Sequence, residues 1–171
     1  MTRTAAPLLD RPLRPHRRAA HAITLLALPS GLWRLGLALG LHLGYTEEGY
    51  RAVCPPGFWG PGYLVLLAVV GESAALLSLG LVQRWGEVVP RRVPLIGGRT
   101  VPAAAVLVPA WSGVAVLAVL WTPLLAWWTM PADGMTPAGH TLVGLLYLPL
   151  VAWAPLLAVL TLAYQRRRRA G

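Results

Sequence analysis

The chain alternates between long apolar runs and short segments that hold most of its polar residues. Four apolar runs stand out, at residues 22–44, 62–83, 101–128 and 141–164. A helix needs about 20 apolar residues, at ~1.5 Å of rise each, to cross a bilayer core. The runs are rich in Leu and Ala and lack the strict alternation of a barrel strand. The pattern predicts an all-α polytopic membrane protein, a four-transmembrane-helix bundle over residues 21–165.

Composition also favours lipid as the surrounding solvent. Of the 171 residues, 56% are hydrophobic and 12% are charged, which leaves few polar groups to cover a water-soluble domain. The formal net charge of +9 does not indicate nucleic-acid binding, because the arginines lie at the ends of apolar runs rather than on one solvated face. We therefore expect the partner of these charges to be the lipid bilayer.

Arginine is distributed unequally between the segments that flank the runs. It is concentrated before the first run, between the second and third, and after the fourth, at Arg3, Arg11, Arg14, Arg17, Arg18, Arg84, Arg91, Arg92, Arg99 and Arg166 to Arg169. The two other loops carry Arg51 together with Glu47, Glu48 and Asp133. The positive-inside bias thus predicts that both termini and the middle loop are cytoplasmic, as an even number of spans requires.

The segments at the two ends of the chain are polar and basic. Residues 1–20 combine arginine and proline without an apolar period, which predicts a disordered basic tail, and residues 166–171 form a second basic tail. The middle loop, residues 84–99, interleaves arginine with apolar residues and is expected to lie on the headgroups. All three clusters are expected to attract anionic headgroups.

Two charges lie inside the apolar runs, Arg34 in the first and Glu72 in the second. Each lies ten residues from the outer end of its run, so both are expected about 15 Å deep on consecutive antiparallel helices. An ionised side chain at a helix centre costs ~2.5 to 3.5 kcal/mol, and an opposite charge at the same level offsets that cost. We predict an intramembrane ion pair that fixes the packing of the first two helices; a titratable Glu72 on an ion or substrate path is the alternative.

Gly36, Gly40 and Gly44 recur at four-residue spacing on a face roughly opposite Arg34. Small residues with this spacing allow close helix contact in lipid. The partner of this glycine face is expected to be the third or fourth helix of the same chain. A homodimer or another membrane protein is the alternative.

Residues able to carry out chemistry are sparse in the sequence. His42, His140, Cys54, Glu47, Glu48 and Asp133 fall near the outer loops without the spacing of metal ligands. Cys54 is the single cysteine, so no intramolecular disulfide forms. It is interpreted as a spectator thiol, and an intermolecular bridge in an oxidising compartment is the alternative. We therefore expect no metal, no cofactor and no enzymatic activity.

Two segments carry a resemblance, Leu28–Arg34 (LPSGLWR) and Val89–Arg99 (VPRRVPLIGGR). Through them the chain resembles four-helix integral membrane proteins of high-GC, actinobacterial-type bacteria, a family without an assigned activity. The resemblance covers the spans and not the N-terminal tail. It implies the four-helix fold and a location in the bacterial plasma membrane, but no reaction. Small multidrug transporters also have four helices, but their membrane carboxylate is in the first helix, whereas Glu72 is in the second.

These observations favour a structural or accessory membrane protein in which Arg34 and Glu72 fix helix pairing. The alternative is a small proton- or ion-coupled transporter that dimerises through Gly36, Gly40 and Gly44, with Glu72 as the proton site. A membrane enzyme that uses the outer-loop histidines and acids is a more distant third hypothesis.

Overall fold

A computed structural model of the chain describes residues 14–83, 88, 98 and 100–170, and nearly all of this part is helical. The β-type pairing in the described residues consists of two isolated bridges, Tyr45–Met135 and Val88–Thr100. The helices, with short 3₁₀ segments marked η, are α1 (Arg14–Ala38), α2 (Glu47–Val53), α3 (Trp59–Leu77), η2 (Ser78–Leu81), α4 (Ala103–Trp121), η4 (Thr122–Thr129), α5 (Pro137–Tyr147), η5 (Leu148–Ala152) and α6 (Trp153–Ala170).

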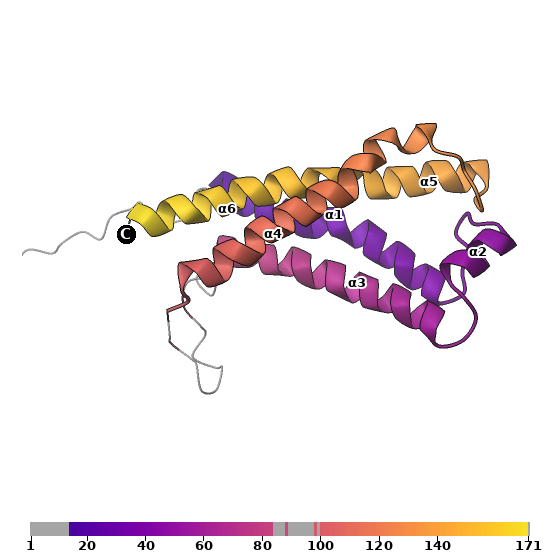
Figure 1. Cartoon of the computed structure of the whole chain (residues 1–171), viewed down its shortest axis with the longest axis horizontal. Coiled ribbons are helices and arrows are strands. Elements are labelled where there is room, and N and C mark those ends of the chain that lie inside the picture. Colours follow the sequence, from indigo (N-terminus) through magenta and orange to yellow (C-terminus); the bar gives the residue numbers. More distant parts are fainter. Residues whose placement is uncertain (1–13, 84–87, 89–97, 99, 171) are drawn as a thin grey trace, which may run out of the picture.

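The long helices form two hairpins that lie side by side (Figure 1). The first pairs α1 with α3. The second pairs α4 with the rod made of α5, η5 and α6, and α1 packs against α6 to join the two hairpins. The helices therefore follow the order α3, α1, α6, α4, and α3 and α4, on the two sides, make no extensive contact with each other.

Proline explains why the second hairpin contains 3₁₀ segments. Pro123 begins η4 and Pro149 begins η5, each within the first two residues of the segment. A proline has no N–H to donate to the preceding turn, so the helix tightens locally instead of continuing its regular ladder. The helical rods nevertheless continue through both sites.

Within the described residues, three helices are long and apolar enough to cross a membrane: Trp59–Leu81, Ala103–Thr129 and Pro137–Arg169. They coincide, to within a few residues at most ends, with the expected runs 62–83, 101–128 and 141–164. The first expected run, 22–44, corresponds to α1, which is long enough but carries Arg14, Arg17, Arg18 and Arg34. The chain is thus all-helical in its described part, with three helices suited to a multi-pass membrane protein.

The boundaries of α1 differ from the expected ones. It begins at Arg14, so residues 14–20 are helical rather than part of a disordered tail. It ends at Ala38, well before Gly44, because Gly40 adopts the left-handed conformation with φ +92°. The Gly40 amide donates to the Leu37 carbonyl and the Leu41 amide to the Gly36 carbonyl, at 3.0 and 3.1 Å. This bonding pattern is the Schellman stop that glycine favours.

The two basic tails and the middle loop are described in part. Residues 166–170, expected as a tail, continue α6. Residues 1–13 and, apart from Val88 and Gly98, the loop 84–99 with its Val89–Arg99 motif lie outside the described residues. Their predicted disorder and headgroup contact stay predictions.

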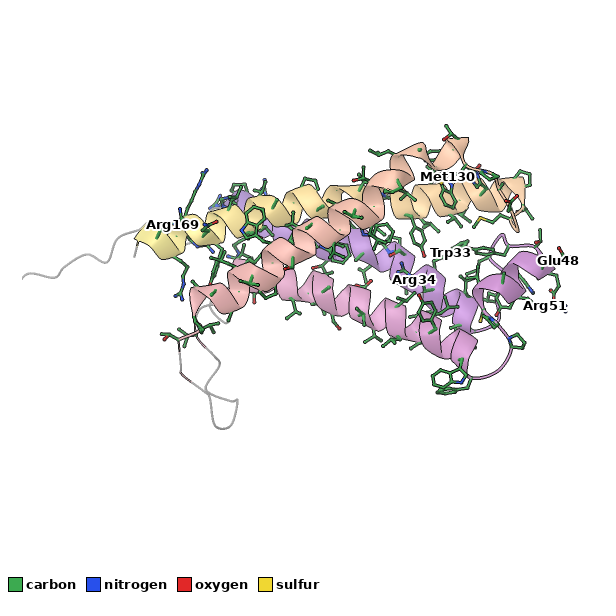
Figure 2. All side chains as sticks on the ribbon, in the orientation of Figure 1. Trp33, Arg34, Glu48, Arg51, Met130 and Arg169 are labelled. Atoms are coloured by element: carbon green, nitrogen blue, oxygen red, sulfur yellow. The ribbon has the colours of Figure 1, made fainter. Side chains whose placement is uncertain are left out.

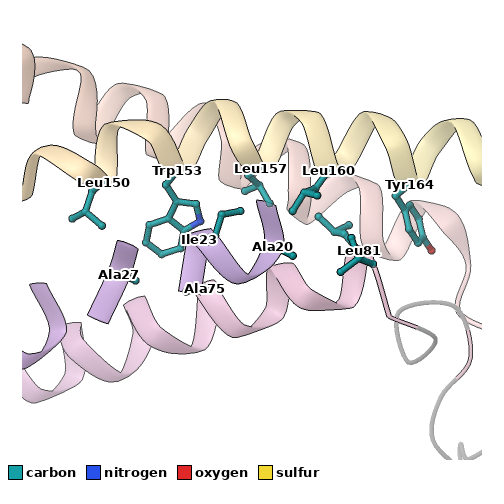
Figure 3. Packing of buried hydrophobic residues seen from close by; sticks show 11 residues of the cluster. Ala20, Ile23, Ala27, Ala75, Leu81, Leu150, Trp153, Leu157, Leu160 and Tyr164 are labelled. Carbon is teal, nitrogen blue, oxygen red and sulfur yellow. The ribbon is translucent and has the colours of Figure 1, made fainter. Parts of the chain in front are cut away.

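The main core lies where α6 meets α1 and α3 (Figure 3). Ala20 and Ala27 of α1 and Ala75 of α3 are almost fully buried. They face large side chains on the α6 side, among them Leu150, Trp153, Leu157, Leu160 and Tyr164. The small residues of α1 and α3 allow these helices to approach the large side chains of α6 closely. A second cluster, around Trp33, Leu37, Leu64 and Val143, lies nearer α2.

Helix α1 is therefore the central helix, and α4 is the peripheral one. Seven residues of α1 are buried, including Ser30 and Gly31, whereas no residue of α4 is buried. Helix α1, with Ser30 and Gly31 buried, thus lies between α3 and α6. The very apolar α4 is left to face the surrounding medium.

Candidate functional site

Arg34 lies on α1, between the two ends of the bundle (Figure 2). Its Nη1 donates to the Ser30 hydroxyl at 3.3 Å, and its Cζ lies 5.1 Å from the centre of the Tyr147 ring. Ser30 precedes it by one helical turn, and its hydroxyl in turn donates to the Ala27 carbonyl at 2.9 Å. The guanidinium is therefore stabilised by a hydroxyl of its own helix and by the aromatic face of a residue on α5.

Glu72 lies opposite this arginine on α3. Its Oε1 lies so close to Gly31 of α1 that a Cβ at Gly31 would be 2.6 Å from it. The carboxylate thus occupies the space that the missing side chain of Gly31 leaves. Because Gly31 is less than one turn from Arg34, the two charges lie at the same level of two facing helices.

The two charges interact electrostatically, but they do not form a short ion pair. The described ion pairs with N···O distances within 4.0 Å, His42–Glu47 and Arg51–Glu47, both lie at the α2 end of the bundle. The role of Arg34 and Glu72 in fixing helix packing stays a prediction. Gly31 and Tyr147 were not anticipated in this centre. The triplet Pro29-Ser30-Gly31 before Arg34 was the available signal for Gly31, and nothing near Tyr147 in the sequence indicated its role.

The three glycines of the expected helix face occupy separate places. Gly36 faces the loop that follows its own helix, since a Cβ there would lie 2.6 Å from Cδ1 of Leu43. Gly40 lies in the turn that terminates α1, and no other atom lies near its Cβ position. Gly44 lies beyond α1, where a Cβ would overlap the backbone of Gly139. Because α1 ends at Ala38, Gly36, Gly40 and Gly44 do not share one helical face. The expectation that they pack together against one partner helix is therefore wrong.

The hairpins meet at their tips through two equivalent turns. Thr46 caps α2 and Thr136 caps α5, each accepting from the amide of a glycine three residues later, Gly49 at 3.2 Å and Gly139 at 3.0 Å. Each threonine also donates, through its backbone amide and its hydroxyl, to the opposite turn. Thr46 binds the Gly134 carbonyl at 3.0 and 3.2 Å, and Thr136 binds the Gly44 carbonyl at 2.9 and 3.1 Å. The tips are thus related by a local pseudo-twofold arrangement around the Tyr45–Met135 bridge.

Glycine is required where the two turns cross. A Cβ at Gly49 would overlap the backbone of Gly134, and a Cβ at Gly139 would overlap the backbone of Gly44. Gly44 and Gly134 also have positive φ, +97° and +73°, which side chains disfavour. The available sequence signal for these paired turns is the spacing G-x-T-x-x-G, which occurs at 44–49 and again at 134–139.

A polar cluster lies beside the first tip. Glu47 binds His42 at 3.0 Å and Arg51 at 2.9 Å, and the His42 ring lies 4.4 Å from the ring of Tyr50. These side chains and Cys54 line a cavity of about 330 Å³ whose other wall is rich in proline. A hydrogen bond with the Cys54 side chain, and then burial, raise the pKa of Tyr50 above its ordinary value.

Glu48, Asp133 and His140 do not join this cluster into a metal site. Among the described residues, no three His, Cys, Asp or Glu side chains come together as ligands. His140 instead stacks on Trp127, with ring centres 4.8 Å apart. Among the described side chains of this cluster, no nucleophile is both exposed and paired with a base, since Cys54 is buried.

Comparison of the chain with protein-family models, with curated proteins and with solved structures finds no match. The class of protein therefore follows from the fold itself. It is all-helical in the described residues, and three of its helices have the length and apolar composition of membrane spans.

Proposed function

We propose that the chain is a four-span protein of the bacterial plasma membrane with a structural or accessory role, in which Arg34 and Glu72 fix the pairing of α1 with α3. The observation that carries the proposal is that the Glu72 carboxylate abuts Gly31 while Arg34, less than one turn away, is held by Ser30 and Tyr147. Both charges thus have a place inside the bundle, which suits a packing role.

Placement of α1 as the fourth span is supported by its surroundings. It has 25 residues, which gives about 37 Å of helix against a hydrocarbon core of about 30 Å. It lies between α3 and α6, and of its polar residues within the bundle Ser30 is buried and Arg34 half-buried. A helix in this position tolerates an arginine that a lipid-facing helix does not.

Orientation is supported by the separation of charges along the bundle. Helix α1 begins and α6 ends at one end, with Arg14, Arg17, Arg18 and the arginines 166–169, whereas α2 with Glu47 and Glu48 lies at the other (Figure 1). The positive-inside bias makes the arginine end cytoplasmic. Single-cysteine variants in a Cys54→Ala background test it. An impermeant maleimide applied to intact cells should label Glu48→Cys and not Arg169→Cys, and the reverse labelling would refute the orientation.

The packing role is tested by a double-mutant cycle. Arg34→Gln leaves the Glu72 carboxylate without its nearby cation and should lower the folded yield and the melting temperature in detergent. Arg34→Gln combined with Glu72→Gln should recover part of the loss, with a coupling of about 1 kcal/mol or more. Arg51→Gln, which breaks an exposed ion pair, is the matched control and should change stability by less than about 1 kcal/mol. A double variant as poor as the worse single variant would refute the coupling.

A second candidate function is proton- or ion-coupled transport with Glu72 as the proton site. The observation that favours it is that the Glu72 carboxylate lies within the bundle beside Gly31 without a short ion pair to Arg34. Flux driven by a pH gradient in reconstituted vesicles, abolished by Glu72→Gln in a variant that still folds, would favour transport. The dimer that this hypothesis invoked would need a surface other than Gly36 and Gly44, which face atoms of the same chain.

A further inference from the structure

An apolar groove runs between the two hairpins, on the side where α3 and α4 stay apart. Its cavity volume is about 520 Å³. One wall comes from α3 and η2, the other from α4, and the floor from Trp153 and Leu157 of α6. Ala105, Ala110 and Gly113 on α4 and Gly80 on η2 are small, and this makes the groove deep. The floor residues belong to the core shown in Figure 3.

The groove has the length of an acyl chain within one leaflet. Its α4 wall runs from Ala105 to Leu117, about 18 Å along the axis at ~1.5 Å per residue. One leaflet of the hydrocarbon core is about 15 Å deep.

Two arginines lie where the groove reaches the end of the bundle. Arg167 of α6 donates to the carbonyl of Leu81, a groove residue, at 2.5 Å, and Arg168 donates to the carbonyl of Val101 at 2.5 Å. Leu81 ends one wall and Val101 precedes the other. Both guanidiniums lie over the ring of Tyr164, at 5.8 and 6.0 Å from its centre. One cation is thus fixed at the end of each wall.

These arginines keep donors free for an anion. A guanidinium has five N–H donors in a fork that matches the oxygens of a phosphate. The bonds to the Leu81 and Val101 carbonyls come from Nη2 of each arginine, so an anion would be bound through the Nη1 side of the fork. Arg166 and Arg169 continue the cluster. An apolar groove one leaflet deep therefore ends at a fixed pair of cations.

We propose that the groove binds one acyl chain of an anionic phospholipid from the surrounding bilayer, whose phosphate is bound by Arg167 and Arg168. The acyl chain fills the space between α3 and α4, which make no extensive contact with each other. The proposal rests on the membrane placement given above, but it does not involve Arg34 or Glu72, so the double-mutant cycle and the test below can fail separately.

The test measures stabilisation of the purified full chain in detergent by phosphatidylglycerol and by phosphatidylcholine with identical acyl chains. Phosphatidylglycerol should raise the melting temperature at concentrations about tenfold lower than phosphatidylcholine. Gly113→Leu, whose side chain extends into the groove, should abolish the effect of both lipids. Arg167→Gln combined with Arg168→Gln should remove the preference for the anionic lipid.

Matched controls separate the groove and its cations from general lipid effects. Val119→Leu adds bulk to an exposed site on α4 outside the groove lining, and Arg169→Gln removes a charge from the same cluster. Both should behave like the wild type. If Gly113→Leu fails to fold, brominated phosphatidylglycerol supplies the readout, since it should quench the fluorescence of the wild type more than that of Trp153→Phe.

Three results would overturn the proposal. The first is equal stabilisation by the two lipids in the wild type. The second is a Gly113→Leu variant that responds as the wild type does. The third is an efficient cross-link, through the introduced cysteine, between two copies of a Gly113→Cys variant in native membranes. Such a cross-link would make a second copy of the protein the occupant of the groove.

Discussion

The two hairpins share one tip design and differ in almost everything behind it. Each tip has a threonine cap, a glycine three residues later and reciprocal bonds to the opposite turn. The first hairpin contains Arg34, Glu72 and the Glu47 ion pairs. In the second hairpin, Asp133 is the acidic residue between Thr100 and Tyr164. The tip thus sets the architecture of both halves, and the charges distinguish the first half. The tips and the charges can therefore be perturbed separately.

The strongest way to break the shared tip is to add a methyl group where the backbones cross. Gly49→Ala and Gly139→Ala should each destabilise the fold by about 3 kcal/mol, because the backbone of the opposite turn must move. Melting in detergent, followed by circular dichroism, measures the effect. Gly71→Ala is the matched control, since no atom lies near its Cβ position, and its effect should stay below about 1 kcal/mol. A tolerated Gly49→Ala would mean that the tips are not packed as described.

A smaller effect should follow from removal of the caps. Thr46→Val and Thr136→Val keep the side-chain shape but lose the hydroxyl, and each should cost about 1 to 2 kcal/mol. Because the turns are equivalent, the two losses should agree to within about 0.5 kcal/mol. Thr141→Val, which loses an exposed bond within one helix, is the control and should be nearly neutral. A loss confined to one cap would refute the equivalence of the turns.

Each hairpin also contains a hydrogen bond from an aromatic side chain to a backbone carbonyl across its tip. In the first, the Tyr50 hydroxyl donates to the Leu37 carbonyl at 2.8 Å, and in the second the Trp127 indole donates to the His140 carbonyl at 2.9 Å. Tyr50→Phe and Trp127→Phe should each cost about 0.5 to 1.5 kcal/mol at neutral pH; Trp127→Phe also loses packing against Gly144. Trp59→Phe, at an exposed site, serves as the control. Two neutral substitutions would show that neither bond contributes to the tips.

The apolar pattern alone was enough to predict the helical class and, to within a few residues at most ends, the three apolar spans. The first run was misjudged at both ends, because Arg14 to Arg18 look like a tail in sequence and the left-handed Gly40 interrupts what looks like a continuous run. Hydropathy registers neither capping nor positive φ.

The candidate centre was predictable only in part. The level of Arg34 and Glu72 followed from counting residues along two antiparallel helices. The contacts with Gly31 and Tyr147 did not, because they depend on how α1 and α5 are rotated about their axes. The groove was hidden for the same reason, since it exists where α3 and α4 fail to meet.

The smallest expected effect is a dependence on alkaline pH that only the first tip should show. The Cys54 side chain, burial and the Glu47 carboxylate raise the pKa of Tyr50 above its ordinary value of 10.0, so the folded state holds this proton more tightly than the unfolded state does. The resulting stability is complete below about pH 10 and is lost as the pH rises through the raised pKa. The melting temperature of the wild type should therefore fall more steeply above pH 10 than that of Tyr50→Phe, while Trp127→Phe, which removes no ionisable group, should keep the wild-type slope. Tyr63→Phe removes an exposed tyrosine and is the control for general alkaline effects; if it flattened the curve as much as Tyr50→Phe, the dependence would not arise at the tip.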